Sequence, residues 1–218
     1  MTRRFDLIVF DWDGTIMDST STISTSIQRA CADLGLAVPS DEAASHVIGL
    51  GLHDALAYAV PDLPAEQLPR MVERYRHHYL SRDGQLCLFV GIDALLAELR
   101  GRDLFLAVAT GKSRVGLDRA LAQSGLGAQF DMTRAADESR PKPHPDMLYE
   151  ISDALGVPLS RTLMVGDTTH DLLMAANARA ASLGVSYGAH PRAQLAPLAT
   201  VGVVDDVAGL RTALLQDA

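Results

Sequence analysis

The sequence predicts an α/β fold: a doubly wound parallel sheet that carries a small all-helical insertion after its first strand. Short runs of apolar, largely β-branched residues indicate buried strands, and amphipathic helical patterns separate most of them. Parallel strands need crossover connections, and helices supply these on both faces of the sheet. Residues 19–88 break the alternation, because they hold helical patterns and no convincing strand.

The expected elements follow one another along the chain in this alternating order. The strands are 5–10, 104–109, 162–165, 182–187 and 201–204, with a weaker candidate at 130–133. The helices between them are 91–100, 114–124, 146–155 and 172–181. Glycine directly follows each of the first three, which is typical of a helix end.

The insertion contains four helical patterns, at 19–34, 40–47, 52–60 and 65–81. Its junctions with the rest of the chain are expected near Asp18 and near residues 89–91. The predicted division is an α/β core of residues 1–18 and 88–218, with a helical unit of residues 19–87 between the two core segments.

The composition excludes several classes of protein. A net charge of -8 and an apolar content of 48% indicate a folded protein without a basic nucleic-acid surface. No run is long enough for a membrane span, and the N-terminus does not resemble a signal peptide, so a cytoplasmic location is expected. Cys31 and Cys87 lack metal-binding spacing and are expected to be reduced. Of the 7 histidines, His77 and His78 are adjacent and the others are dispersed, and none of them forms a zinc motif.

The first strand runs into two carboxylates, Asp11 and Asp13, followed by Gly14. Ligands of open α/β sheets bind beyond the carboxyl ends of the strands. One carboxylate there can attack phosphorus, and a second can protonate the leaving alkoxide and then activate water. The alternative from the residues alone is an acidic turn that caps the next helix.

Two further segments offer phosphate-binding groups. The strand 104–109 ends in Thr110 and Gly111, where a hydroxyl and free backbone N–H groups suit a phosphate oxygen. Lys142 lies between two prolines that restrict its loop. It is one of only two lysines in the chain, the other being Lys112. An ordinary exposed loop lysine is the alternative.

The strand 162–165 leads into Asp167, Thr168 and, one helical turn later, Asp171. With Asp11, these carboxylates offer the hard oxygen ligands that Mg²⁺ prefers. Asp167 acting only as a helix cap is the alternative. The four segments together, in one chain order and at one sheet edge, favour a catalytic site.

These segments, DxDGT, TGK, PKP and GDxxxD, resemble the four motifs of haloacid dehalogenase superfamily hydrolases, over residues 5–207. The residues at 184–188 are similar to the phosphoglycolate-phosphatase-like subgroup. The resemblance implies a Rossmann-like core with the helical insertion as its cap. It implies Asp11 as nucleophile and Asp13 as general acid and base.

The resemblance also implies the binding roles. Thr110, Gly111 and Lys142 would hold the phosphoryl group. Asp11, the Asp13 carbonyl and Asp167 would bind Mg²⁺. Asp171 and Thr168 would orient these groups without binding the metal themselves. Asp18 matches a position that we assign to capping.

The predicted activity is Mg²⁺-dependent hydrolysis of a small phosphorylated metabolite through an aspartyl-phosphate, with phosphoglycolate as a candidate substrate. A sugar phosphomutase, a pyrophosphatase and a non-catalytic phosphate-binding protein remain alternatives. The presence of Asp13 disfavours dehalogenation. Gly49, Leu50 and His53 are the candidate cap residues for substrate selection, and the sequence leaves the oligomeric state open.

Overall fold

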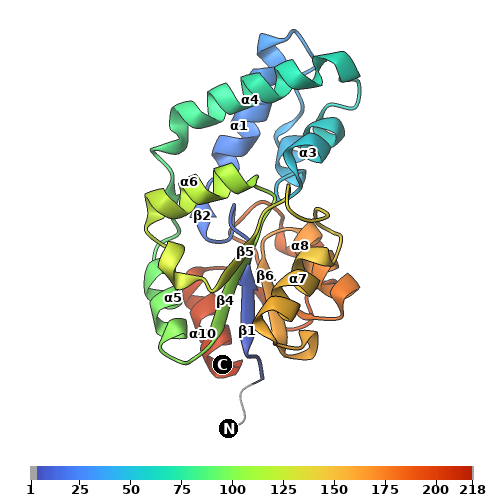
Figure 1. Ribbon diagram of the computed structural model, residues 1–218. Coiled ribbons are helices and arrows are strands. Elements are labelled where there is room, and N and C mark those ends of the chain that lie inside the picture. The colour runs from blue at the N-terminus through green and yellow to red at the C-terminus, as the bar shows by residue number, and fades with distance from the viewer. Residues whose placement is uncertain (1–3, 218) are drawn as a thin grey trace.

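The computed structural model describes residues 4–217 and shows one six-stranded parallel sheet (Figure 1). The strand order is β5-β4-β1-β6-β7-β8. The strands are β1 (Leu7–Phe10), β4 (Phe105–Ala109), β5 (Met132–Arg134), β6 (Thr162–Gly166), β7 (Ala181–Val185) and β8 (Gly202–Val204). The predicted α/β class is therefore confirmed, and each expected strand is present with its ends shifted by one or two residues.

The register of the three central strands determines where the site forms. Strand β1 lies between β4 and β6, and Phe10 pairs with both Val108 and Val165. Because the three strands are parallel and end at the same level, the segments that follow them leave the sheet at one edge. These segments carry the first, second and fourth of the sequence motifs.

Helices cover both faces of the sheet. They are α5 (Ile92–Arg100), α6 (Arg114–Ser124), α7 (Asp146–Leu155), α8 (Thr169–Ala178), α9 (Arg192–Leu195) and α10 (Val207–Asp217). Figure 1 shows α5 and α10 on one face and α7 and α8 on the other.

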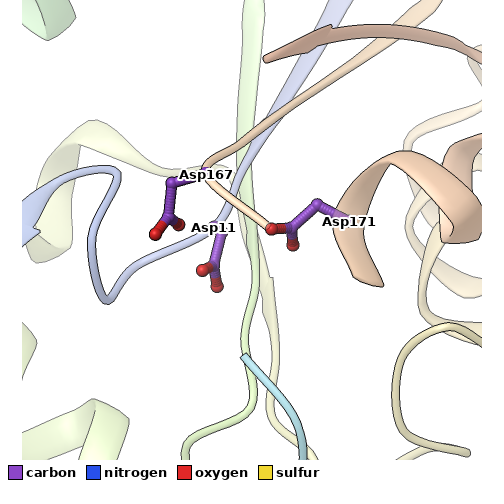
Figure 2. Close-up of side chains that lie close together, drawn as sticks. All are labelled: Asp11, Asp167 and Asp171. Atoms are coloured by element: carbon purple, nitrogen blue, oxygen red, sulfur yellow. The ribbon is translucent and has the colours of Figure 1, made fainter. Parts of the chain in front are cut away.

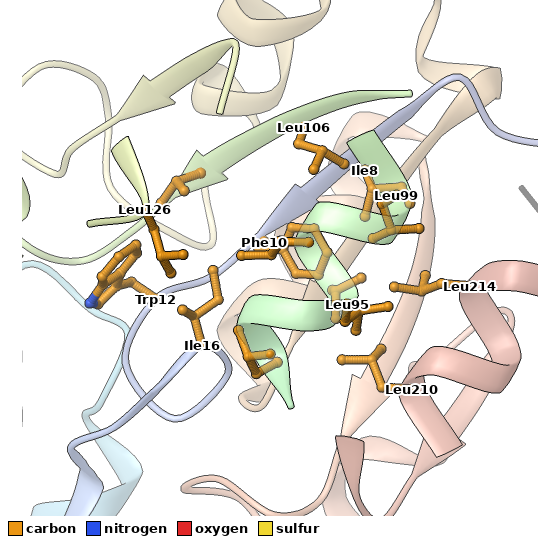
Figure 3. Close-up of a cluster of buried hydrophobic side chains, with 14 of the residues drawn as sticks. Ile8, Phe10, Trp12, Ile16, Leu95, Leu99, Leu106, Leu126, Leu210 and Leu214 are labelled. Atoms are coloured by element: carbon orange, nitrogen blue, oxygen red, sulfur yellow. The ribbon is translucent and has the colours of Figure 1, made fainter. Parts of the chain in front are cut away.

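Strand β1 is buried on both sides, as its uninterrupted apolar sequence predicts. Ile8 and Phe10 pack with Leu95 and Leu99 of α5 and with α10 in one core cluster, which Figure 3 shows. Leu7 and Val9 belong instead to a second cluster, with α7 and α8 on the opposite face. Successive side chains of the strand thus serve opposite cores.

The helical insertion forms a separate layer over the carboxyl edge of the sheet (Figure 1). It contains α1 (Thr20–Asp33), α2 (Asp41–His46), α3 (Leu52–Ala59), the 3-10 turn Ala65–Gln67 and α4 (Leu68–Asp83). These elements share their own apolar cluster, which includes Ile27, Cys31, Leu56 and Met71. The cap thus has a hydrophobic core of its own.

A short ladder connects the chain where it enters and leaves the insertion. Strand β2 (Met17–Asp18) pairs antiparallel with β3 (Cys87–Leu88). The ladder lies next to the predicted domain boundaries, which stay predictions. The sequence pattern did not reveal β3, since two residues carry no periodicity.

One predicted helix ends earlier than expected. Helix α8 stops at Ala178, Arg179 takes a left-handed conformation with φ of 58°, and β7 begins at Ala181. The predicted helix 172–181 is wrong at its end because the apolar pattern continues into the strand without glycine or proline. Within residues 4–217, no helix is both long and apolar enough to cross a membrane.

Candidate active site

The loop after β1 turns sharply and separates its two carboxylates. The amides of Ile16 and Met17 both donate to the Trp12 carbonyl, at 2.9 Å. Gly14 has a φ of 81°, and a Cβ at this position would overlap the Asp167 carboxylate. Glycine is therefore required both for the turn and for the close approach of the two loops.

Asp11 lies at the centre of a fully buried charge cluster. Lys142 Nζ donates to Asp11 Oδ1 at 2.7 Å and to Asp171 Oδ1 at 2.6 Å, and the lysine side chain is 0% exposed. Among residues 4–217, Asp11 Oδ2 is buried without a hydrogen-bond partner. One oxygen of the predicted nucleophile is thus fixed, and the other is unpaired.

Asp167 and Asp171 are oriented by different partners. Asp167 accepts from Thr15 Oγ1 at 3.0 Å and from the Ala189 amide at 2.7 Å. Asp171 accepts from the Thr168 amide at 3.1 Å and from its hydroxyl at 2.7 Å. Thr168 and Asp171 therefore form the capping box of α8, and Asp167 is not the helix cap.

The three carboxylates converge at the sheet edge, as Figure 2 shows. Asp11, Asp167 and Asp171 each place one oxygen within 4.8 Å of the others. Burial raises the pKa of Asp11 to about 7, against the lowering effect of Lys142. Burial, with Asp11 nearby, also raises the pKa of Asp167. One buried lysine does not balance three buried carboxylates, so the site fits an added cation.

Asp13 points to a different set of groups, on the side of the cap. Ser19 Oγ donates to Asp13 Oδ1 at 2.6 Å, and Lys112 Nζ lies 3.0 Å from the same oxygen. Lys112 also donates to the Tyr79 hydroxyl of α4 at 2.9 Å. The acid predicted for proton transfer is thus held between core and cap.

Sequence reasoning did not assign Ser19 or Lys112 to the site. The available signal for Lys112 was its rarity, since the chain has two lysines and both lie at this sheet edge. Asp18 was assigned to capping, but it is exposed in β2, and Ser19 occupies the cap position of α1. That assignment is wrong because the short ladder extends through Asp18.

Thr110 and Gly111 lie where the second motif was expected. Thr110 is fully buried at the end of β4, and its hydroxyl accepts from the Lys112 amide at 3.2 Å. A Cβ on Gly111 would overlap the backbone carbonyls of Gly49 and Leu50. The cap loop of Gly49 and Leu50 therefore lies directly against Gly111, and only glycine at position 111 permits this contact.

A cavity of about 840 Å³ lies between cap and core. Gly49, Leu50 and His53, the predicted substrate residues, line it together with Asp13 and Gly111. The structure thus brings the candidate cap residues to the same cavity as Asp13, the predicted acid. Their part in substrate selection stays a prediction.

Three histidines that are far apart in the sequence meet beside this site. His170 Nε2 and His190 Nε2 both donate to the His46 carbonyl, at 2.9 and 3.1 Å. The His46 and His190 rings stack with centroids 4.9 Å apart. Burial lowers the pKa of His190 to about 4, so this imidazole is neutral at neutral pH. The cluster joins the cap to the loop after β7, and sequence spacing gave no sign of it.

Comparisons with known proteins agree with this geometry. The family model described as haloacid dehalogenase-like hydrolase matches residues 8–185. The chain is 37% identical to the "Probable phosphatase IndB" of Dickeya dadantii, over 96% of this chain and 95% of that protein. It is 30% identical to a phosphoglycolate phosphatase of Agrobacterium fabrum, over 96% and 92% of the two chains.

A solved structure shows the same fold over nearly the whole chain. It is a predicted phosphoglycolate phosphatase from Haemophilus somnus, with a TM-score of 0.85 and 25% identity. The alignment covers 97% of this chain and 98% of the other. The likeness therefore includes the cap as well as the sheet.

The chain belongs to the haloacid dehalogenase-like hydrolase family. Within that family it is a phosphatase, as the relatives that match it over almost their full length are named.

Proposed function

We propose that the protein hydrolyses a small phosphate monoester with Mg²⁺, through a phosphorylated Asp11. The observation that carries this proposal is the state of Asp11 at the sheet edge. Lys142 holds one of its oxygens, while the other is buried and, among the described residues, unpartnered. An oriented carboxylate with one free oxygen is suited to attack phosphorus.

The donor set fits a magnesium ion. Asp11, the carbonyl of Asp13 and Asp167 would hold it, and the presence of three buried carboxylates around one lysine and the raised pKa of Asp167 support this choice. Asp171 is engaged by Lys142 and Thr168, which favours a supporting role over direct ligation. When bound, Mg²⁺ supplies positive charge that neutralises the phosphoryl group.

The side chains then divide the reaction between them. Lys142, Thr110 and the Gly111 amide bind the phosphoryl oxygens, and Asp11 attacks phosphorus in line. Asp13 protonates the departing ester oxygen and afterwards takes a proton from the water that hydrolyses the aspartyl-phosphate. Ser19 and Lys112 hold Asp13 in place for both steps.

The finer substrate assignment starts from the relatives. Several proteins similar to this chain are named phosphoglycolate phosphatase, so 2-phosphoglycolate is the first metabolite to test. A mutase, a pyrophosphatase and a binding protein remain the alternatives for the same set of residues.

The direct test of the proposed function is hydrolysis of para-nitrophenyl phosphate by the purified chain, with Mg²⁺ and with EDTA. We expect turnover with Mg²⁺ and loss of at least about a hundredfold with EDTA, because the phosphoryl charge is then poorly balanced. Activity that is equal in EDTA would contradict the magnesium assignment. Absence of turnover in both conditions would contradict the phosphatase proposal.

Magnesium is expected to stabilise the fold, and more so at high pH. Folding raises the pKa of Asp11 from 3.8 to about 7, so without a cation the free energy of unfolding falls as pH rises through this range. A bound Mg²⁺ would offset the buried negative charge that the Asp11 proton neutralises at lower pH. At about 100 times its Kd it adds roughly 2.7 kcal/mol, or about 5–10 °C in Tm.

The measurement is thermal unfolding at pH 5.5 and pH 8, with and without Mg²⁺. The increase in Tm should be larger at pH 8 and should shrink in Asp167→Asn, which lacks one ligand charge. An equal increase at both pH values, or an unchanged increase in the variant, would argue against binding at these carboxylates.

A further inference from the structure

The cavity between cap and core lies on the leaving-group side of the site. Of the groups assigned to catalysis, Asp13 and Gly111 line it, and the fully buried Lys142 does not. Asp13 is the residue that protonates the departing oxygen in the proposed function, on which this inference rests. The alcohol part of the substrate must therefore occupy this cavity.

Its size exceeds the needs of a two-carbon leaving group. A volume of about 840 Å³ lies near the upper end of the range for small-molecule sites, about 300–1,000 Å³. A glycolate unit would leave most of this space to water. The volume alone thus favours a larger alcohol.

The walls of the cavity are largely apolar. Ile27, Val47, Leu50, Leu52, Tyr75 and Tyr79 of the cap line it. The two tyrosine rings stack with centroids 5.9 Å apart and an angle of 23°. Leu50 and Leu52 are partly exposed in the free protein, so an apolar ligand would remove their surface from water.

The charged groups of the cavity offer little to a carboxylate. Lys112 is already paired with Asp13 at 3.0 Å, and Arg119 with Asp83 at 2.6 Å. Arg76, the remaining arginine of the lining, is exposed. Two exposed carboxylates, Asp54 and Asp137, also line the cavity. A short anionic leaving group would have to displace Asp13 from Lys112 or bind at the exposed rim.

We propose that the substrate is a phosphate monoester of an alcohol with an apolar or aromatic body, which lies against Leu50, Leu52 and the Tyr75–Tyr79 pair. Burial of an aromatic ring there is expected to contribute about tenfold or more in affinity over a small or carboxylate-bearing ester.

The test measures binding in the Asp11→Asn variant, which does not consume the ligand. The probes are 2-phenylethyl phosphate, ethyl phosphate and 2-phosphoglycolate, each titrated calorimetrically in the presence of Mg²⁺. We expect 2-phenylethyl phosphate to bind at least about tenfold more tightly than the other two. Equal affinities, or tighter binding of 2-phosphoglycolate, would overturn the proposal.

A pair of second substitutions locates the effect. Adding Leu52→Asn to the same variant should weaken the binding of 2-phenylethyl phosphate about fivefold relative to that of ethyl phosphate, because the cavity wall becomes polar. Val38→Asn is the matched control, since Val38 is a cap residue that is 54% exposed and lies outside the lining. If both substitutions changed the relative affinity for the two esters equally, the cavity would not be the cause of the preference.

Failure of this inference is distinguishable from failure of the proposed function. Turnover of para-nitrophenyl phosphate by the unmodified chain tests the phosphatase chemistry. The binding preference of the Asp11→Asn variant tests which alcohol the cavity accepts, whether or not turnover is found.

Discussion

Asp11→Asn is expected to abolish turnover, by about 10⁴-fold or more, while leaving the fold intact. The amide has the same shape as the carboxylate but cannot attack phosphorus to form the acyl-phosphate bond. The amide is neutral, so the variant buries two carboxylates instead of three around Lys142. The Tm should therefore not fall. The measurement is kcat/KM with para-nitrophenyl phosphate beside a thermal melt.

The control for this variant is Asp18→Asn, which removes an exposed carboxylate of β2 a few residues away. It should retain full activity. The unmodified enzyme, quenched during turnover and reduced with borohydride, should carry homoserine at position 11, because borohydride reduces an acyl-phosphate. Turnover in Asp11→Asn, or no modification at residue 11, would overturn the nucleophile assignment.

The sequence predicted the central part of the site because that part depends on strand ends. Asp11, Thr110 and Asp167 each follow a run of apolar residues, and the pairing of β1 with both β4 and β6 brings the three ends to one level. Parallel alternation was enough to place them together. Lys142 required more, since its loop is not at a strand end and its burial could not be read from the sequence.

What the sequence did not predict lies where the cap meets the core. Lys112 reaches Tyr79, and His46 meets His170 and His190, across separations that no local pattern encodes. These contacts depend on how the helical layer is set on the sheet, and amphipathic periodicity gives only the faces that pack. The apolar walls of the cavity arise in the same way.

Lys142→Met is expected to be the most destabilising single substitution at the site. The lysine is completely buried and donates to Asp11 and Asp171, so its loss leaves two buried carboxylates without their cation. Removing one partner of a buried ion pair costs about 3–5 kcal/mol. Methionine fills most of the volume, so the loss reflects charge more than packing. Turnover should also fall by about a hundredfold or more, because the phosphoryl group loses a charged donor.

The pH dependence of this loss separates charge from packing. Lys142 lowers the pKa of Asp11 against burial, so without it the carboxyl holds its proton to a higher pH. The variant should therefore be destabilised more at pH 8 than at pH 5.5, since the unfolded chain gains stability by ionising Asp11. Urea unfolding at the two pH values without metal measures this difference. Arg140→Met, which breaks the largely exposed pair of Arg140 with Asp146, is the control and should change stability little at either pH. A loss in Lys142→Met that is equal at both pH values would mean that shape, and not the buried charge cluster, makes this lysine necessary.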